Sequence, residues 1–172
     1  MAKKFIILDT ETTGLEVRQG HKIIEIGAVV LNDRKKSSDH FHAYINPGRA
    51  IDEEASKVHG ISNQDLENEP MFAAIADDFI EFIQGSTLII HNAPFDVGFL
   101  NSELKSVSAK YPKLEDICEI EDSLVLARNK FPGQRNSLDA LANRFEVSGY
   151  DRSFHGALLD ANILADVYIY LT

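Results

Sequence analysis

Short apolar runs separated by polar turns dominate the first fifty residues. The runs cover residues 4–9, 22–32 and 39–46, and each is rich in Ile, Val, Phe or Tyr. β-Branched and aromatic residues in runs of this length, with glycine or polar residues between them, are typical of strands. The pattern therefore predicts three successive strands that form a β-meander.

The spacing of the apolar residues changes after Asp52. Large apolar residues then recur at steps of three and four and stop just before Gly85, a residue type favoured directly after a helix end. They are Phe72, Ile75, Phe79, Phe82 and Ile83. This period predicts an amphipathic helix, and the short apolar run at 87–90 that follows it predicts a fourth strand.

The second half of the chain has the pattern of several helices. Pro94 marks the first turn of one helix, with Phe95, Phe99 and Leu100 on its inner side. Further helices are predicted at residues 123–130, 137–145 and 156–171. Strands first, then a strand and helices in alternation, predict an α/β fold in which helices flank a mixed sheet.

Length and composition narrow the class of protein. With 172 residues, 44% of them hydrophobic, the chain has the size of one ordinary domain, so we expect a single domain over residues 1–172. The one cysteine, Cys118, excludes an internal disulfide and a multi-cysteine zinc site. No apolar run approaches the roughly 20 residues that span a bilayer, so we expect a cytoplasmic protein without membrane contact.

Net charge bears on the choice of partner. The 17 basic and 27 acidic side chains give a formal charge of -10, which argues against a broad basic face for nucleic acid. The objection weakens where acids bind divalent cations, because a phosphate responds to the local charge. Some basic residues remain candidates for phosphate contacts, although ordinary surface charge is the simpler interpretation of each. They are Lys57, Lys105, Lys110, Lys113, Arg128, Lys130, Arg135, Arg144 and Arg152.

A pair of acids follows the first apolar run. Asp9 and Glu11 come directly after Leu8 and precede a turn at Gly14. Residues two apart in a strand face the same side, so the two carboxylates project together. Such a pair is costly unless a cation compensates it, and hard divalent ions prefer oxygen ligands. The alternative is a solvated turn at the end of a strand.

Two further sites carry polar residues at a change of secondary structure. Asp96 follows the strand at 87–90 and falls near the first turn of the next helix, where an acid also simply complements the helix dipole. His155 and Asp160 lie at the start of the last helix, close enough to share one site if that helix packs across the sheet. A histidine in this position is otherwise a surface or capping residue.

Taken together, the three motifs have a familiar order. Asp-x-Glu, then Asn-x-x-Phe-Asp from Asn92, then His-x4-Asp resembles the three motifs of the DnaQ-like, DEDD-type exonucleases of the histidine subgroup. Residues 20–28, 58–61, 131–141 and 155–161 also resemble the epsilon subunits of bacterial DNA polymerase III. The resemblance therefore extends over essentially the whole chain.

The resemblance implies a fold, an activity and a set of functional residues. It implies a ribonuclease H-like sheet and a 3′→5′ exonuclease that releases nucleoside 5′-monophosphates from DNA ends, as in the proofreading of replication. It implies two divalent ions, Mg²⁺ or Mn²⁺, and a general base, His155. The metal-binding and catalytic acids carried over are Asp9, Glu11, Asp96 and Asp160. The substrate contacts carried over are Thr10, Leu15, Glu54 and His59.

The resemblance also implies partners. The expected substrate is single-stranded DNA or a frayed 3′ end, since a mismatched terminus is easier to unpair. Association with the alpha subunit of DNA polymerase III is implied by resemblance alone, because the tail through which epsilon subunits bind the polymerase has no counterpart in these residues.

Three other functions remain open from the sequence. An exoribonuclease of the same superfamily uses the same acids and metals, and differs in how it treats the 2′-OH. A binding or structural subunit that has lost catalysis is disfavoured, because all four acids and His155 are present. A metal-dependent phosphatase is the remaining enzymatic alternative.

Overall fold

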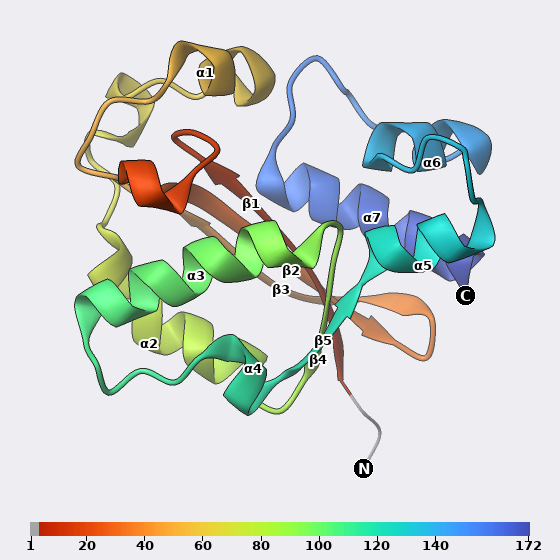
Figure 1. Ribbon diagram of the computed structural model, residues 1–172, viewed down its shortest axis with the longest axis horizontal. Coiled ribbons are helices and arrows are strands. Elements are labelled where there is room, and N and C mark those ends of the chain that lie inside the picture. Colours follow the sequence, from red (N-terminus) through yellow and green to blue (C-terminus); the bar gives the residue numbers. More distant parts are fainter. Residues whose placement is uncertain (1–3) are drawn as a thin grey trace.

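The protein is built on one mixed β-sheet (Figure 1). The structure, a computed structural model, describes residues 4–172. The strand order is β3-β2-β1-β4-β5, with β1, β4 and β5 parallel and β2 antiparallel to both neighbours, β1 and β3. The strands are β1 Phe5–Thr12, β2 Ile23–Asn32, β3 Lys35–Tyr44, β4 Thr87–Ile90 and β5 Glu119–Asp122. The expected mixed sheet flanked by helices is therefore confirmed.

Helices cover both faces of this sheet. In Figure 1, α2 and α3 lie on one face and α7 crosses the other, where α5 and α6 pack against it. The helices are α1 Glu53–His59, α2 Phe72–Ile83, α3 Ala93–Val107, α4 Leu114–Ile117, α5 Ser123–Lys130, α6 Leu138–Arg144 and α7 Ala157–Leu171. Short 3₁₀ turns occur at Val17–Gln19 and Gln64–Leu66. Within residues 4–172, no helix combines the length and apolarity needed to cross a bilayer.

Alternation along β1 decides which side chain faces which layer. Ile6 and Leu8 belong to the buried cluster that contacts α2 and α3, whereas Ile7 belongs to the cluster under α7. Since successive side chains of a strand point to opposite faces, Asp9 and Glu11 face α7, and Thr10 faces α3. The central strand thus presents acids to one helix and a hydroxyl to another.

The start of α7 is fixed against β2. A Cβ on Gly27 would lie 2.2 Å from the backbone nitrogen of Leu158, so only glycine allows the helix to approach this closely. The buried carboxylate of Glu25 accepts a hydrogen bond from the backbone nitrogen of Ala157 at 2.8 Å. Gly27 and Glu25 pair with Asp9 and Glu11 in the sheet, so the first turn of α7 lies beside those acids.

Several predicted boundaries were wrong. The first strand continues to Thr12 instead of ending at Asp9, so Glu11 lies within it, and the third strand is Lys35–Tyr44 instead of residues 39–46. The last helix begins at Ala157. Pairing with β2 extends both strands past their apolar runs, because backbone hydrogen bonds do not depend on side-chain polarity. The elements α1, α4 and β5 had not been predicted.

Candidate active site

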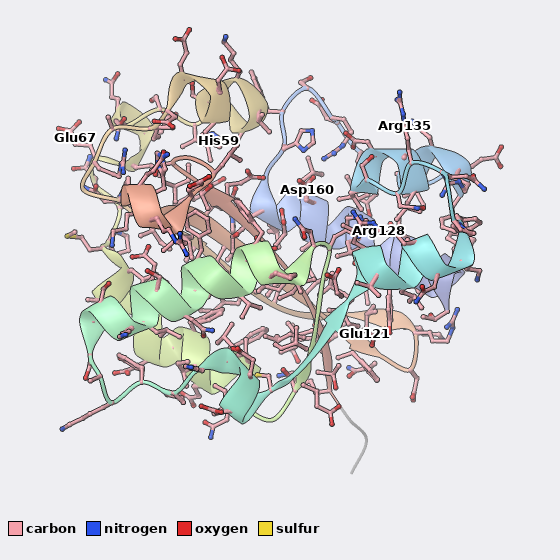
Figure 2. All side chains as sticks on the ribbon, in the orientation of Figure 1. His59, Glu67, Glu121, Arg128, Arg135 and Asp160 are labelled. Atoms are coloured by element: carbon pink, nitrogen blue, oxygen red, sulfur yellow. The ribbon has the colours of Figure 1, made fainter. Side chains whose placement is uncertain are left out.

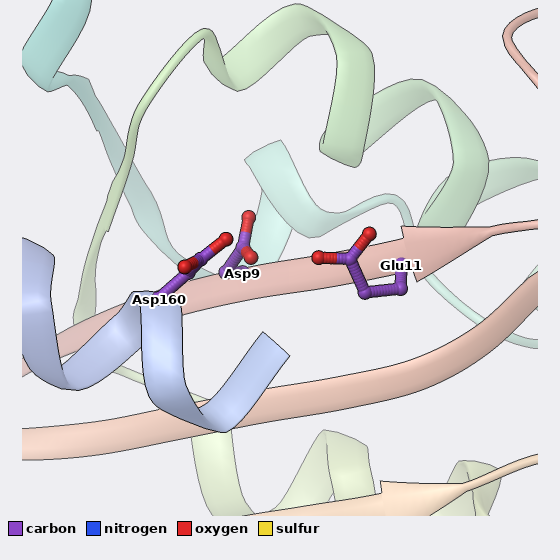
Figure 3. Close-up of side chains that lie close together, drawn as sticks. All are labelled: Asp9, Glu11 and Asp160. Atoms are coloured by element: carbon purple, nitrogen blue, oxygen red, sulfur yellow. The ribbon is translucent and has the colours of Figure 1, made fainter. Parts of the chain in front are cut away.

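Three of the expected acids meet at the centre of the molecule. Asp9 and Glu11 from β1 and Asp160 from the first turn of α7 each offer an oxygen atom, and these atoms all lie within 4.8 Å of one another. Figure 3 shows the carboxylate of Glu11 turned back along the strand toward Asp9, with Asp160 on the other side of Asp9. The strand and the helix that were predicted separately therefore contribute to one cluster.

Asp96 approaches the same cluster from the α3 side of the sheet. It lies in the first turn of α3, which carries Pro94 near its start, and only 3% of its surface is exposed. The hydroxyl of Thr10 donates a hydrogen bond to the Asp96 carboxylate at 2.6 Å. Thr10, an expected substrate contact, is thus engaged with one of the acids.

The four carboxyl groups have strongly perturbed acidity. Burial is the largest cause for each, and it raises the pKa of Glu11 to about 9 and that of Asp96 to about 7. Burial, followed by the charges of Asp96, Glu11 and Asp160, raises the pKa of Asp9 well above its ordinary range. Burial also raises the pKa of Asp160, against the lowering effect of Arg152.

The burial and mutual repulsion of these carboxyl groups bear on whether the site fits a metal ion. The clustered ligands are all carboxylates, which suit a hard divalent ion such as Mg²⁺ or Mn²⁺ and offer no sulfur or nitrogen for a softer one. Bound cations would favour the ionised form of every acid and offset the mutual repulsion. The residues present therefore fit a divalent-metal site.

The segment before α7 places a histidine and an arginine on Asp160. Nδ1 of His155 lies 3.5 Å from one carboxylate oxygen of Asp160, and Arg152 forms an ion pair with the other oxygen. Both also contact Asp139 in the first turn of α6, His155 through Nε2 at 3.6 Å and Arg152 through a second ion pair. Arg152 is consequently engaged by carboxylates instead of being free for phosphate.

Helix α1 holds the histidine segment from the opposite side. The backbone nitrogen of His155 donates to the carbonyl of Val58 at 2.9 Å. The ring of Phe154 sits over Gly60, where an added Cβ would lie 2.8 Å from the ring atoms. The position of His155 therefore depends on α1 as well as on the acids.

A pocket of about 560 Å³ lies beside Glu11, between the end of β1 and α1. All four expected substrate contacts line it: Thr10, Leu15, Glu54 and His59. Leu15 is 81% exposed and leaves an apolar side chain at the rim. A cavity of similar volume, about 580 Å³, lies at the other end of β1, near Phe5 and Arg34, but the acid cluster is not there. The neighbouring acid cluster, and not the cavity volume, therefore identifies the candidate site.

The hydrogen bonds of His59 define one tautomer of its ring. Its Nδ1 accepts a hydrogen bond from the backbone nitrogen of Ile61 at 3.0 Å, so its Nε2 donates to the carbonyl of Thr12 at 3.2 Å. Burial is the main cause that lowers the pKa of this imidazole. His59 thus presents a neutral ring to the pocket.

Several residues of this region were not among the expected site residues. Val58 and Phe95 line the pocket, and Asp139 contacts both His155 and Arg152. Phe95 had been assigned to the inner side of its helix, although it also stands inside the Asn-x-x-Phe-Asp motif. Val58 and Asp139 lie inside segments that resemble the family, but neither belongs to its three motifs, and a valine and a first-turn acid are common in any helix.

Comparison with known proteins identifies a family. Residues 6–168 match the family model described as "Exonuclease". The chain is 54% identical over 167 residues to the DNA polymerase III subunit epsilon of Rickettsia prowazekii, covering 97% of this chain and 73% of the relative. It is 49% identical over 171 residues to the subunit of the same name from Escherichia coli K12, covering 97% and 70%.

Solved structures give the same result for the fold. Exonuclease X in complex with 5′ overhanging duplex DNA has a TM-score of 0.76 and 26% identity, covering 97% of this chain and 90% of that one. The nuclease domain of 3′hExo, a DEDDh family member bound to rAMP, has a TM-score of 0.81 at 20% identity, covering 98% and 90%. The second likeness bears on the fold alone.

Proposed function

The chain belongs to the DnaQ-like exonuclease family, together with the epsilon subunits of bacterial DNA polymerase III, and we propose that its substrate is the 3′ end of DNA. As a member of this family it is a 3′→5′ exonuclease. One observation carries the proposal: Asp9, Glu11, Asp96 and Asp160 face one site beside a pocket of about 560 Å³, a volume suited to a small ligand such as one nucleotide.

The four acids would hold two divalent ions, Mg²⁺ or Mn²⁺. When bound, such ions supply an activated water and neutralise charge on the attacking and leaving oxygens of a phosphodiester. The protein's own contribution is to fix the carboxylates in place before the substrate arrives. Pairing of Asp9 with Gly27 in the sheet and the close approach of α7 at that glycine support this role.

His155 is the general base in this proposal. Its imidazole accepts the proton of the attacking water, because it stands at the edge of the acid cluster, 3.5 Å from Asp160. Asp139 at 3.6 Å stabilises the protonated ring that results. The hydrogen bond from the His155 backbone to Val58 holds the backbone of this segment beside α1.

The pocket binds the terminal nucleotide. Leu15, Val58 and Phe95 offer apolar surface for a base and sugar, while Thr10, Glu54 and His59 offer polar groups. Apolar surface stacks against any base, so we expect no sequence preference. Selectivity for mismatched ends then follows from the ease with which a mispaired terminus becomes single-stranded.

The biological setting is proposed from the relatives. Two of them, at 54% and 49% identity, are DNA polymerase III epsilon subunits, which supports proofreading in replication, in the bacterial cytoplasm, with the alpha subunit as a partner. The RNA-related likeness is 20% identical and supports the fold only, so an exoribonuclease is the weaker alternative.

Digestion of end-labelled strands tests the proposal directly. A 5′-labelled DNA oligonucleotide and its RNA counterpart are incubated with Mn²⁺ or Mg²⁺, or with chelator, using wild type beside Asp9→Ala. We expect a metal-dependent ladder that shortens from the DNA 3′ end and is absent in the variant. Faster digestion of RNA would assign the protein to RNA processing, and cleavage of neither strand would refute the exonuclease proposal.

A further inference from the structure

The structure separates the basic residues into engaged and free ones. Lys57 pairs with Glu54 at 3.2 Å, Lys130 donates to the carbonyl of Leu171, and Arg152 is held by acids. In the described part of the chain, Arg128 and Arg135 are exposed and form no side-chain hydrogen bond or ion pair. Exposed arginines without partners, on an acidic protein, are available for a phosphate.

The backbone around Arg135 is held firmly. The buried amide of Asn136 donates to the carbonyls of Phe131 at 3.2 Å and Gln134 at 3.1 Å, which closes the loop between α5 and α6. Arg144 donates to the Asn136 side chain at 3.1 Å and to the carbonyl of Arg135 at 2.6 Å, while its guanidinium lies over the Phe131 ring. The loop is therefore a rigid support that displays Arg135 to solvent.

A histidine ties this loop to the catalytic end of the sheet. Nε2 of His91 donates to the carbonyl of Asn136 at 2.6 Å, and the Ser123 hydroxyl is 2.9 Å from Nδ1. His91 directly follows β4 and stands two residues before α3, the helix of Asp96. Burial is the main cause that lowers the pKa of His91, and the charge of Arg128 contributes, so Arg128 also lies near this junction.

The acids lie between the two arginines and the nucleotide pocket. In Figure 1, α1 and α6 stand on opposite sides of the first turn of α7, which carries Asp160. The pocket is on the α1 side, and in Figure 2 Arg128 and Arg135 both lie on the α5–α6 side of Asp160. A strand with its terminal nucleotide in the pocket and its scissile phosphate at the acids can therefore continue toward these arginines.

We propose that Arg128 and Arg135 form a second binding site, which holds the phosphodiester backbone of single-stranded DNA on the 5′ side of the scissile bond. The inference rests on the proposed function and adds a site to it. Guanidinium groups bind phosphate oxygens through paired hydrogen bonds and keep their charge at any physiological pH. They offset, at the place where the strand arrives, the repulsion that a net charge of -10 exerts on DNA.

The test compares DNA strands, which have further phosphates on the 5′ side of the scissile bond, with a substrate whose only phosphate is the one that is cleaved. Arg128→Gln, Arg135→Gln and the double variant are assayed on single-stranded DNA of 2 to 12 nucleotides and on the p-nitrophenyl ester of thymidine 5′-monophosphate. The matched control is Lys35→Gln, an exposed cation on the β2–β3 hairpin at the far end of the sheet. Arg135→Lys reports whether charge alone suffices.

We expect each Gln variant to raise KM for the longer strands by about tenfold and to lower the slope of log affinity against log salt by roughly 0.7. Turnover of the ester stays at the wild-type value in every variant, since the ester does not reach the arginines. Unchanged KM and salt slope in the double variant, or an equal loss on strand and ester, would overturn the second site. Failure of wild type on both substrates would instead refute the proposed exonuclease function.

Discussion

Strand β1 and the segment between α6 and α7 both deliver functional side chains, but they are held in different ways. Asp9 and Glu11 sit in the central strand, paired with β2 at Gly27 and Glu25. His155 lies outside regular structure. Its backbone nitrogen donates to Val58, its neighbour Phe154 packs over Gly60 at the end of α1, and its ring contacts Asp139 and Asp160. Asp9 and Glu11 are therefore fixed by the sheet, whereas the backbone of the histidine segment is positioned by α1, which also lines the proposed nucleotide pocket.

This difference suits two different roles, metal ligation by the acids of the strand and proton acceptance by the histidine of the loop. A metal site needs ligands that stay within tenths of an ångström, which a buried strand provides. A proton acceptor has to be in place only when a nucleotide is bound, and a contact through α1 links it to the pocket. Variants in the two regions should separate metal affinity from turnover.

The largest effect is expected from Asp9→Asn, which keeps the size of the side chain and removes the central carboxylate. Turnover on single-stranded DNA should fall by about a thousandfold or more, on the order of 4 kcal/mol of barrier, because the acid cluster that would hold the ions loses its central carboxylate. Calorimetric titration with Mn²⁺ should show weaker binding as well. Asp39→Asn, an exposed position on β3, is the matched control. Retention of a tenth of the activity would contradict a central role for Asp9.

A smaller loss is expected from His155→Ala. Removal of a general base typically costs about 10²- to 10³-fold in turnover, while the carboxylates remain. Mn²⁺ affinity should therefore stay close to that of wild type, in contrast to Asp9→Asn. Turnover above half of the wild-type value would remove His155 from the mechanism, and a parallel loss of metal affinity would erase the distinction between the two regions.

Gly60→Ala addresses the contact between α1 and the histidine segment. Gly60 has φ of +69°, and its new Cβ would meet the ring of Phe154 at 2.8 Å. Gly85→Ala is the control, because Gly85 has φ of +79° with no atom within 4 Å of the added Cβ. Both substitutions strain the backbone by about 1 kcal/mol. We expect turnover to fall by about tenfold in Gly60→Ala only, and equal activity of the two variants would show that the contact is dispensable.

The last prediction concerns the pH dependence of stability, which leaves turnover aside. The pKa of Glu11 is about 9 in the folded protein and 4.5 as the ordinary value, so the folded state binds the extra proton between these pH values. In chelator, the free energy of unfolding should therefore fall as pH rises from 5 to 9, by at most about 1.4 kcal/mol per pH unit for each such group. Saturating Mn²⁺ should flatten the slope, and urea titrations at several pH values measure it. Stability that rises with pH in chelator would contradict this prediction.

The sequence predicted four of the five strands and the side-by-side position of Asp9 and Glu11, because these features leave strong local signals. Apolar periodicity marked β2, α2 and β4, and Asp9 with Glu11 stood directly after an apolar run. The missed elements are short or polar: β5 has four residues, three of them acidic, and α1 has no apolar stripe. Their existence depends on neighbours in space, which no local pattern records.

The contacts of the site were harder to foresee than its residues. Arg152 had been a candidate for phosphate binding, yet it pairs with Asp139 and Asp160. Each of these pairs joins residues from different elements, so the choice between phosphate and carboxylate follows from tertiary packing. The firm support of Arg135 by Asn136 and Arg144 depends in the same way on how one loop closes.

The placement of Asp9 on the first strand and Asp160 on the last helix has a consequence for protein synthesis. A ribosome delivers the chain in order, at about 5 to 20 residues per second, so the first carboxylates leave the exit tunnel many seconds before their partner. Until α7 docks at Gly27, the nascent chain has an incomplete set of ligands. Unfinished copies therefore lack the complete set of acids that the proposed nuclease activity requires.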